Sequence, residues 1–486
     1  MSKDRVLARN LRTSVCGTRI LQRTCSTVVT HDVSTSCSNM VGIALAASLA
    51  SKPLTKHLNV AIIDNNPLLG RRNIIEKGHQ PDPRVSTVTP ATISFLKDIG
   101  AWKYIEQQRH AYFDKMQALD IQDTMLMMYI KMFWGKHIAI YICILDDVNS
   151  CVLIVDMIQE SDLQKTVYPA RLNAMDMLPS SSLTGLGEVP STTDLFMRGR
   201  LAKLELSDGN RVYAKLVVGA DGSKSRVREL AGIKTTGWNY SQNAIICTVE
   251  HTAENYTAWQ RFLPNGPIAL LPIGDKFSNI VWTMDPKEAS DRKLMNEDDF
   301  IKAVNDALDS GYGPNPETTS SRDSLSWLTG DATISAKERF ETPPKVVKLS
   351  SERMMFPLSL RHAKDYVSKR VALVGDSAHT VHPLAGQGVN LGFADACALS
   401  KAIAEGIALG TDIGEANLLK RYEAERKPAN IAMMAVLDGI QKMYSLDFGP
   451  LNALRAAAFH GAHYISPLKK RIISYASGEQ SLPLFS

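Results

Sequence analysis

The most informative run in the chain is Gly375-Asp376-Ser377-Ala378-His379, continued by His382-Pro383-Leu384-Ala385-Gly386-Gln387-Gly388-Val389-Asn390-Leu391-Gly392. The strand predicted for residues 371–374 ends at this acidic residue, and the glycines lead into a helix predicted for Leu391 to Ile407. A carboxylate at a strand end can accept hydrogen bonds from ribose or ribityl hydroxyls, and the N–H groups that open a helix face an anion. The run therefore predicts a nucleotide-type cofactor site in an α/β fold.

A second run, in the middle of the chain, carries an Asp-Gly pair after a strongly apolar strand. It is Val217-Val218-Gly219-Ala220-Asp221-Gly222-Ser223-Lys224-Ser225-Arg226-Val227-Arg228. An Asp-Gly pair alone is a common turn, but this pair precedes the Gly-Asp run as it does in the flavoprotein aromatic hydroxylases. The two runs together resemble that family, and the segment ending at Gly392 resembles its ubiquinone-biosynthesis branch. The resemblance extends over residues 31–476 and is patchy over 124–200.

The resemblance implies an FAD cofactor and a p-hydroxybenzoate-hydroxylase-like fold. This fold is α/β: a doubly wound, Rossmann-like FAD-binding domain with an inserted antiparallel-sheet substrate domain and C-terminal helices. By resemblance, Asp376 binds the ribityl chain, and Pro383 and the backbone of 386–390 border the isoalloxazine ring. Asp221 holds the FAD-facing loop, with Arg228 behind it. The cofactor contacts that we expect are Gly42, Asp64, Arg84, Asp221, Gly222, Arg228, Gly375, Asp376, Pro383, Gly386, Gly388, Val389 and Asn390.

Near the N-terminus the pattern predicts a βαβ unit between Asp32 and Asp64. Where the family has GxGxxG after the first strand, this chain has Cys37-Ser38-Asn39-Met40-Val41-Gly42 and retains only the last glycine. A non-glycine residue in a left-handed turn costs roughly 1–2 kcal/mol, and a Cβ there hinders the approach to a pyrophosphate. The altered loop puts the FAD affinity in question. The alternative is that this stretch and residues 124–163, which also depart from the family pattern, come from wrongly joined coding segments.

At 486 residues the chain is too long for a single core, so we expect several segments to assemble into two domains. We predict an FAD-binding domain from 31–102, 195–236 and 350–410, and a substrate domain from 103–123 and 237–349. Residues 411–486 form a C-terminal helical region, and 124–194 stay unassigned. A loop is predicted for 310–323, which is rich in Gly, Pro, Ser and Thr.

Composition narrows the class of protein further. The net charge of +5 is small and scattered, which argues against a nucleic-acid binder. Seven cysteines without a CxxC pair indicate reduced thiols and no metal site. The first 30 residues are rich in Arg and poor in acids, which is typical of a mitochondrial transit peptide; a basic tail is the alternative. No apolar run approaches the roughly 20 residues that a membrane-spanning helix needs.

The resemblance also implies a reaction. A flavin-dependent monooxygenase would use O2 to hydroxylate the ring, at C5, of a polyprenyl-4-hydroxybenzoate intermediate, with electrons from ferredoxin and ferredoxin reductase. It would lie peripherally on the matrix side of the mitochondrial inner membrane, in a complex with other coenzyme Q biosynthesis proteins. The basic run Lys469-Lys470-Arg471 could contact anionic lipid, or it could be a solvated helix end.

Three interpretations stay open at this point. The run contains no acid–base triad, and His379 and His382 are either packed side chains or catalytic groups. An FAD/NADPH hydroxylase of another phenol would share the two motifs. A non-catalytic scaffold of the biosynthetic complex would explain the missing glycines, and it would purify without flavin.

Overall fold

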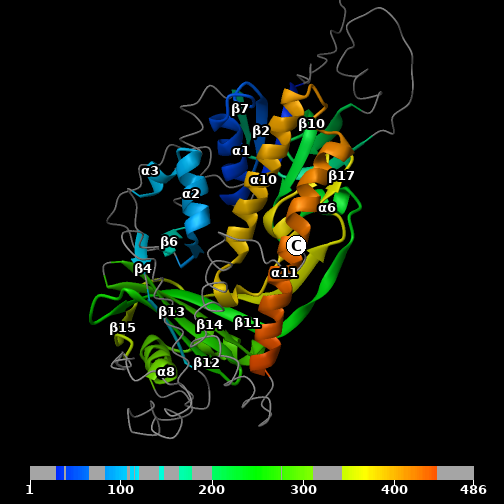
Figure 1. Cartoon of the computed structure of the whole chain (residues 1–486). Coiled ribbons are helices and arrows are strands. Elements are labelled where there is room, and N and C mark those ends of the chain that lie inside the picture. The colour runs from blue at the N-terminus through cyan, green and yellow to red at the C-terminus, as the bar shows by residue number, and fades with distance from the viewer. Residues whose placement is uncertain are drawn as a thin grey trace, which may run out of the picture.

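The computed structural model of the chain describes residues 29–37, 40–64, 83–106, 110–113, 115–119, 142–146, 164–177, 200–274, 276–309 and 342–445. Two large sheets lie one above the other in Figure 1, and the helices α10 and α11 run alongside both. Several predictions fall outside the described residues: the transit peptide up to residue 28, the loop at 310–323 and the basic run at 469–471.

The first sheet is mostly parallel and has the order β17-β18-β10-β1-β2-β7, with β9 beside β10 and β8 beside β9. Its strands are β1 (Val29–Cys37), β2 (Asn59–Ile63), β7 (Gln164–Tyr168), β8 (Leu172–Asp176), β9 (Ala202–Leu206), β10 (Arg211–Ala220), β17 (Val367–Ser368) and β18 (Val371–Leu373). Segments from the start, middle and end of the chain thus meet in one sheet. The predicted βαβ unit is confirmed, because β1 and β2 are parallel and adjacent and α1 (Met40–Ser51) connects them.

Helices α1 and α10 (Gly388–Ala408) pack together next to this sheet (Figure 1). Every residue of α1 from Met40 to Ala50 is buried. This burial accounts for the apolar composition of the helix, in which Ser48 is the single buried polar residue. A Cβ on Gly392 would lie 2.5 Å from Val41 Cγ2, so only glycine allows α10 to approach α1 this closely. The remaining helices near this sheet are α2 (Pro90–Asp98), α3 (Trp102–Ile105), α6 (Arg226–Leu230) and α11 (Ala416–Ser445).

The helix predicted for Leu391 to Ile407 begins three residues earlier, at Gly388. A short 3-10 turn, η4 (Pro383–Ala385), precedes it, and Gly386 adopts φ +61 and reverses the chain. Glycine is a poor helix former in a helix interior. It is tolerated at Gly388 because this residue lies in the first turn, where the N–H groups have no intrahelical partner.

The second sheet is antiparallel except where β5 pairs with β12, and its order is β19-β16-β11-β14-β13-β12-β5, with β15 beside β11. Its strands are β5 (Lys115–Leu119), β11 (Thr235–His251), β12 (Thr257–Leu263), β13 (Gly266–Gly274), β14 (Phe277–Met284), β15 (Val346–Leu349), β16 (Met354–Ala363) and β19 (His379–Thr380). Helices α7 (Pro286–Leu294) and α8 (Glu297–Asp309) cover one face, where Phe300 packs near Trp282. The antiparallel sheet expected beside the FAD-binding fold is therefore confirmed, and its strands β12 and β13 are joined by a turn at 264–265.

A third, three-stranded sheet has the order β3-β6-β4, with β3 (Val85–Val88), β4 (His110–Phe113) and β6 (Ile142–Asp146). Within 124–163, which showed no clear pattern, the structure describes β6 only. Strand β16 belongs to the antiparallel sheet although 350–410 was assigned to the FAD-binding domain. The domain boundaries stay a prediction.

Candidate functional site

Five parallel strands, β7, β2, β1, β10 and β18, end at one edge of the first sheet, and the predicted acidic residues follow three of them. Cys37 at the end of β1 is opposite Ala220 of β10, and Leu373 of β18 is opposite Gly219. Asp64, Asp221 and Asp376 therefore emerge at the same edge, where open α/β sheets bind their ligands. Asp64 is buried, and its backbone N–H donates to the carbonyl of Tyr168.

The Gly-Asp motif forms the tight 3-10 turn η3 (Gly375–Ser377), with Gly375 at φ +61. Hydrogen bonds hold this turn from behind: Val374 N–H donates to the Gly219 carbonyl, and Ser377 Oγ donates to the same carbonyl. The Asp376 carboxylate accepts no hydrogen bond from any described residue. Burial raises the pKa of Asp376, and nearby His379 partly offsets this rise. A half-buried acceptor without a donor fits a ligand that brings hydroxyl groups.

The glycine-rich run places the start of α10 beside this carboxylate. A Cβ on Gly388 would lie 4.0 Å from Asp376 Oδ1, and Val389 follows it in the first helical turn. A Cβ on Gly386 would lie 3.1 Å from the Thr87 side chain. Gly386 thus lies close against Thr87 because it has no side chain, and the N-terminus of α10 favours electron-rich ligand atoms beside Asp376.

Asn390 ties the start of α10 to the segment around β3. Its Oδ1 accepts from Thr89 N–H at 2.9 Å and from Thr92 Oγ1 at 2.8 Å. Its Nδ2 donates to the carbonyls of Thr87, at 2.8 Å, and Gly386, at 3.1 Å. All four bonds hold protein, so the side chain of Asn390 shapes the site, and only its backbone is available to a ligand.

The Asp-Gly motif likewise stabilises its own loop. Asp221 accepts from Ser225 Oγ at 2.6 Å and from the backbone N–H groups of Arg226 and Val227, at 2.7 and 3.1 Å. Gly222 has φ +80, which favours glycine. Asp221 therefore holds its own loop in this structure, and its contact with FAD stays a prediction.

The remaining predicted contacts are less well defined. Gly42 is buried in the first turn of α1, one residue after Val41, which packs against Gly375 and Gly392. Arg84 is exposed directly before β3, and Pro383 opens η4. The altered loop at 38–39 lies outside the described residues.

Both histidines of the motif are fully buried. His379 Nε2 lies 2.6 Å from Asp395 Oδ2, and His382 packs edge-on against Tyr240 with ring centroids 5.0 Å apart. Burial lowers the pKa of His382 to about 4. These contacts favour packed side chains over catalytic groups. The sequence interpretation missed Asp395, although a single acid within the apolar run from Leu391 to Leu399 signals a buried partner.

The face of the antiparallel sheet away from α7 and α8 carries half-buried apolar side chains together with the buried polar residues Thr248, Asn279 and Thr283. Alternation along the strands puts Ile246, Ala269 and Val281 in one row across this face, because their strands pair at these positions. Gln260 belongs to the same row, and its Nε2 donates to the Leu384 carbonyl at 3.2 Å. The row therefore adjoins η4. Trp259 points to the opposite face and packs in the core near α8.

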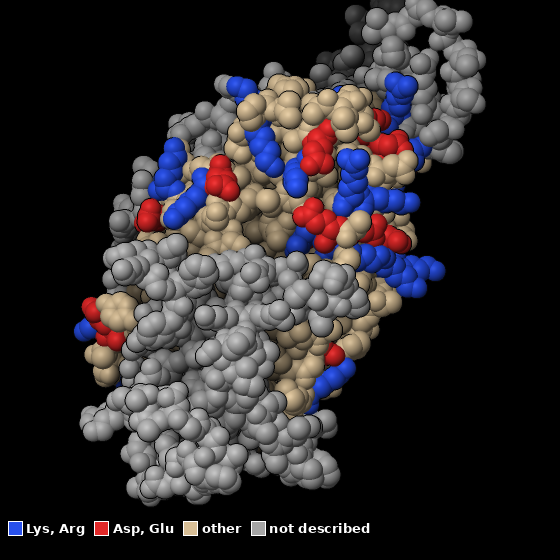
Figure 2. Space-filling model, viewed as in Figure 1, with Lys and Arg blue, Asp and Glu red and all other residues tan. Residues whose placement is uncertain are grey.

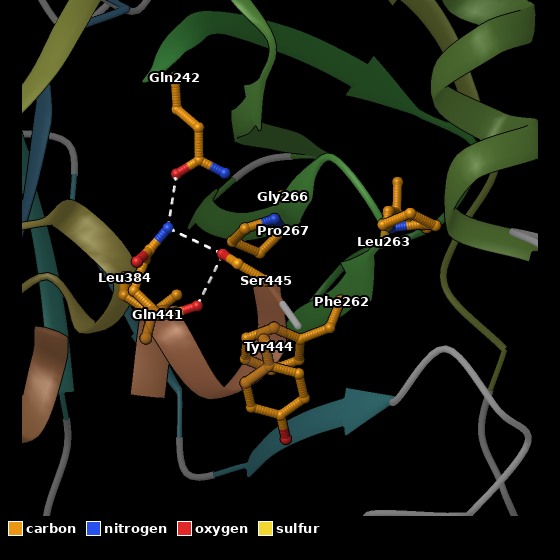
Figure 3. Close-up of a pocket in the computed structure, with 10 residues that line it drawn as sticks. Gln242, Phe262, Leu263, Gly266, Pro267, Leu384, Gln441, Tyr444 and Ser445 are labelled. Atoms are coloured by element: carbon orange, nitrogen blue, oxygen red, sulfur yellow. Dashed lines mark hydrogen bonds between the residues drawn. The ribbon is translucent and has the colours of Figure 1, made fainter. Parts of the chain in front are cut away.

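A small pocket lies between the turn joining β12 and β13, η4 and the end of α11 (Figure 3). Phe262 and Tyr444 stack in it at 3.7 Å between ring centroids, with Leu384 nearby. Gln441 Nε2 donates to Gln242 Oε1 at 3.1 Å and to Ser445 Oγ at 2.9 Å. The pocket has an aromatic wall and a polar rim, with room for roughly one water molecule.

The distribution of charged side chains and of metal-binding side chains was compared with the position of this site. Figure 2 shows Lys and Arg interspersed with Asp and Glu on the described part of one face. The described residues include no group of three or more His, Cys, Asp or Glu side chains that could hold a metal ion. No helix in the described part of the chain is both long and apolar enough to span a membrane.

Comparison with known proteins agrees with this geometry. The sequence matches the family described as FAD binding domain over residues 72–327 and 328–436. The chain belongs to that family and is an FAD-dependent aromatic monooxygenase. The match begins after the altered N-terminal loop.

Within this class the chain belongs to the family of mitochondrial ubiquinone biosynthesis monooxygenases named COQ6. It is 33% identical to the Xenopus tropicalis protein over 461 residues, which is 92% of this chain and 93% of the relative. It is also 33% identical to the Homo sapiens protein over 466 residues, 93% of each chain.

Solved structures share the fold at lower identity. p-Nitrophenol 4-monooxygenase PnpA of Pseudomonas putida has a TM-score of 0.65 and 16% identity, and the match covers 93% of this chain and 100% of PnpA. Anhydrotetracycline hydroxylase OxyS of Streptomyces rimosus has a TM-score of 0.61 and 16% identity, covering 93% of this chain and 76% of OxyS. The fold class expected from the two motifs is confirmed.

Proposed function

We propose that this protein hydroxylates the aromatic ring of a polyprenyl-4-hydroxybenzoate intermediate in ubiquinone biosynthesis, at C5. The observation that carries this proposal is the 33% identity, over almost the whole of both chains, to enzymes named for that pathway. The unpaired Asp376 carboxylate beside Gly388 supports it at the level of the site.

The residues at the common strand edge fit FAD. Asp376 would accept hydrogen bonds from the ribityl hydroxyls, and Asp64 would accept them from the ribose. The backbone from Gly386 to Asn390 would border the ring, with the positive end of α10 facing its electron-rich edge. Arg228 and Asp221 would act indirectly, by holding the loops that the cofactor contacts.

Bound FAD, once reduced, activates O2 so that one oxygen atom can be transferred to an electron-rich phenol ring. This chain's part is to place the phenol and exclude water. The half-buried row Ile246, Ala269 and Val281 offers an apolar surface next to η4, and ligand sites are commonly lined this way.

Electrons would come from ferredoxin and its reductase, and the enzyme would lie peripherally on the matrix side of the inner membrane with other coenzyme Q proteins. The word mitochondrial in the relatives' names supports the compartment. The donor and the membrane contact rest on the family resemblance alone.

The test is an oxygen-incorporation assay with the purified full-length chain loaded with FAD. Polyprenyl-4-hydroxybenzoate is supplied with O2 and either reduced ferredoxin or NADPH. We expect a product heavier by one oxygen atom with ferredoxin only, hydroxylated at C5 by NMR. Turnover with NADPH would favour a hydroxylase that takes its electrons directly from NADPH. A chain that stays colourless with excess FAD would favour a scaffold.

A further inference from the structure

The C-terminal helix α11 reaches the Gly-Asp turn through one buried carboxylate, that of Asp395 on α10. Its Oδ2 accepts the Gly375 backbone N–H at 3.1 Å and lies 2.6 Å from His379 Nε2. Its Oδ1 accepts Arg426 Nε at 2.9 Å and Asn430 Nδ2 at 3.0 Å. One oxygen therefore binds the cofactor motif, and the other binds α11.

The carboxylate is ionised although it is fully buried. Burial alone would raise its pKa, but His379 and then Arg426 lower the pKa of Asp395 to about 2. A buried charge requires partners in good geometry, and removal of one partner leaves the other uncompensated. The positions of Asp395 and of the Gly375 N–H that it binds thus depend on Arg426.

A second bond from the same helix face holds the strand that delivers the motif. Tyr422 Oη donates to the Leu373 carbonyl at 2.7 Å, one helical turn before Arg426. Leu373 is the last residue of β18, and Gly375 follows two residues later. Helix α11 therefore binds the end of β18 directly, through Tyr422, and the turn indirectly, through Asp395.

We propose that Arg426 is a positioning residue for the cofactor: through Asp395 it fixes the Gly375 N–H, and so the direction in which Asp376 presents its carboxylate. Gly375 makes this control necessary, because glycine in the left-handed region moves at little steric cost. Without the anchor behind it, the turn would sample orientations in which Asp376 no longer meets the ribityl hydroxyls. Arg426 itself touches only Asp395 and Asn430 among the residues of this network.

The test compares Arg426→Met with Arg421→Met in the full-length chain. Arg421 lies on the same helix but is exposed, and its ion pair with Glu405 is loose, at 3.7 Å. The readouts are the FAD dissociation constant, from fluorescence titration of the apoprotein, and the visible circular dichroism of bound FAD. We expect at least tenfold weaker FAD binding and an altered dichroism for Arg426→Met, and a change below twofold for Arg421→Met. FAD binding by Arg426→Met within twofold of the unmodified chain would overturn the proposal.

A second variant separates positioning from simple stability. Arg426→Met leaves the buried charge of Asp395 without its cation and should lower the thermal midpoint. The double variant Asp395→Asn/Arg426→Met removes both charges and should regain much of that midpoint. A positioning role predicts that this double variant, once stable, still binds FAD at least fivefold more weakly. Recovery of both the midpoint and the FAD affinity would mean that the ion pair serves stability alone.

Arg426→Lys is the third probe and keeps a buried cation without the Nε–H. We expect FAD binding several-fold weaker than in the unmodified chain, and equal affinity would contradict the proposal. FAD affinity is measured without turnover, so the result is independent of the phenol that the enzyme hydroxylates. An unmodified chain that binds no FAD would also overturn the inference.

Discussion

Arg228 donates from one guanidinium nitrogen to the Ser377 carbonyl at 2.7 Å and so joins two motifs that are 149 residues apart. A second nitrogen donates to the Ser223 carbonyl, also at 2.7 Å. The Asp-Gly loop and the Gly-Asp turn are therefore held at a fixed separation by a single side chain. No single predicted element contains this contact, because it forms only when β10 and β18 pair in the sheet.

Replacing Arg228 with methionine should weaken FAD binding and lower the free energy of unfolding by about 1–3 kcal/mol, since two backbone carbonyls lose a charged donor. Lys224→Met is the control, because Lys224 is an exposed cation in the same loop. FAD titration and urea unfolding measure the two effects. If the two variants have the same FAD affinity and the same free energy of unfolding, the hydrogen bonds of Arg228 contribute to neither.

Gly392→Ala should destabilise the protein by about 1–3 kcal/mol through overpacking. The new Cβ would meet Val41 Cγ2 at 2.5 Å and the Gly375 backbone at 3.3 Å. Gly439→Ala in α11 is the matched control: nothing lies within 4 Å of its Cβ, so it should stabilise by roughly 0.5–1 kcal/mol through helix propensity. Both are measured by chemical denaturation.

The double variant Val41→Ala/Gly392→Ala checks the cause of this destabilisation. It should lose less stability than the sum of the two single variants, because the shortened side chain leaves room for the new methyl group. Strict additivity would locate the strain elsewhere.

What could be predicted from the sequence were local units: the strand, turn and helix around Gly375, the strand and turn around Asp221, and the βαβ unit between Asp32 and Asp64. Their signals are apolar runs and turn residues, which act over a few positions. The start of α10 at Gly388 was placed three residues late, because glycine lowers helix propensity but is tolerated in the first turn.

Asp395 was missed for a different reason. Its role depends on Gly375, 20 residues before it, and on Arg426, 31 residues after it. Residue spacing along one helix carries no information about such partners. The same holds for Asn390, because three of its four side-chain bonds join α10 to a segment about 300 positions earlier in the chain.

Asp376→Asn should make the apoprotein more stable at pH 7 while weakening FAD binding. Burial raises the pKa of Asp376, so the unfolded chain ionises first as the pH increases. Below the unfolded pKa, near 3.9, Asp376 is protonated in both states, and its contribution to the free energy of unfolding is fully present. This contribution is lost as the pH rises through the folded pKa. The variant has no such loss, so its advantage in thermal midpoint should vanish at low pH.

Thermal unfolding of the Asp376→Asn apoprotein between pH 3.5 and 7.5, with an FAD titration at pH 7.5, measures both effects. Asp208→Asn is the control, because Asp208 is exposed in the turn between β9 and β10 and distant in sequence from the motif. A variant less stable than the unmodified apoprotein at pH 7 would argue that Asp376 has protein partners and is not reserved for a ligand.

His382→Leu should reduce the loss of stability on acidification. His382 is fully buried, and neither ring nitrogen has a hydrogen-bond partner among the described residues. Burial lowers the pKa of His382 to about 4, against a small opposing effect of Asp438. Because the folded pKa of His382 is lowered, its contribution to the free energy of unfolding is fully present above the unfolded pKa, near 6.5. This contribution is lost as the pH falls to about 4.

Burial also lowers the pKa of His362, to about 4, and the pKa of His251. Among the described residues, the unmodified protein should therefore lose stability through three histidines on acidification and the variant through two. Removing two unpaired ring nitrogens should also leave the variant at least as stable at pH 7. Unfolding midpoints from pH 7 to 4 measure this, with the exposed His57→Gln as control. If His382→Leu falls as steeply as the unmodified chain, His382 is protonated at the same pH in both states. The turn that leads into Pro383 would then be open to water, which would weaken the case for a dry face on this side of the site.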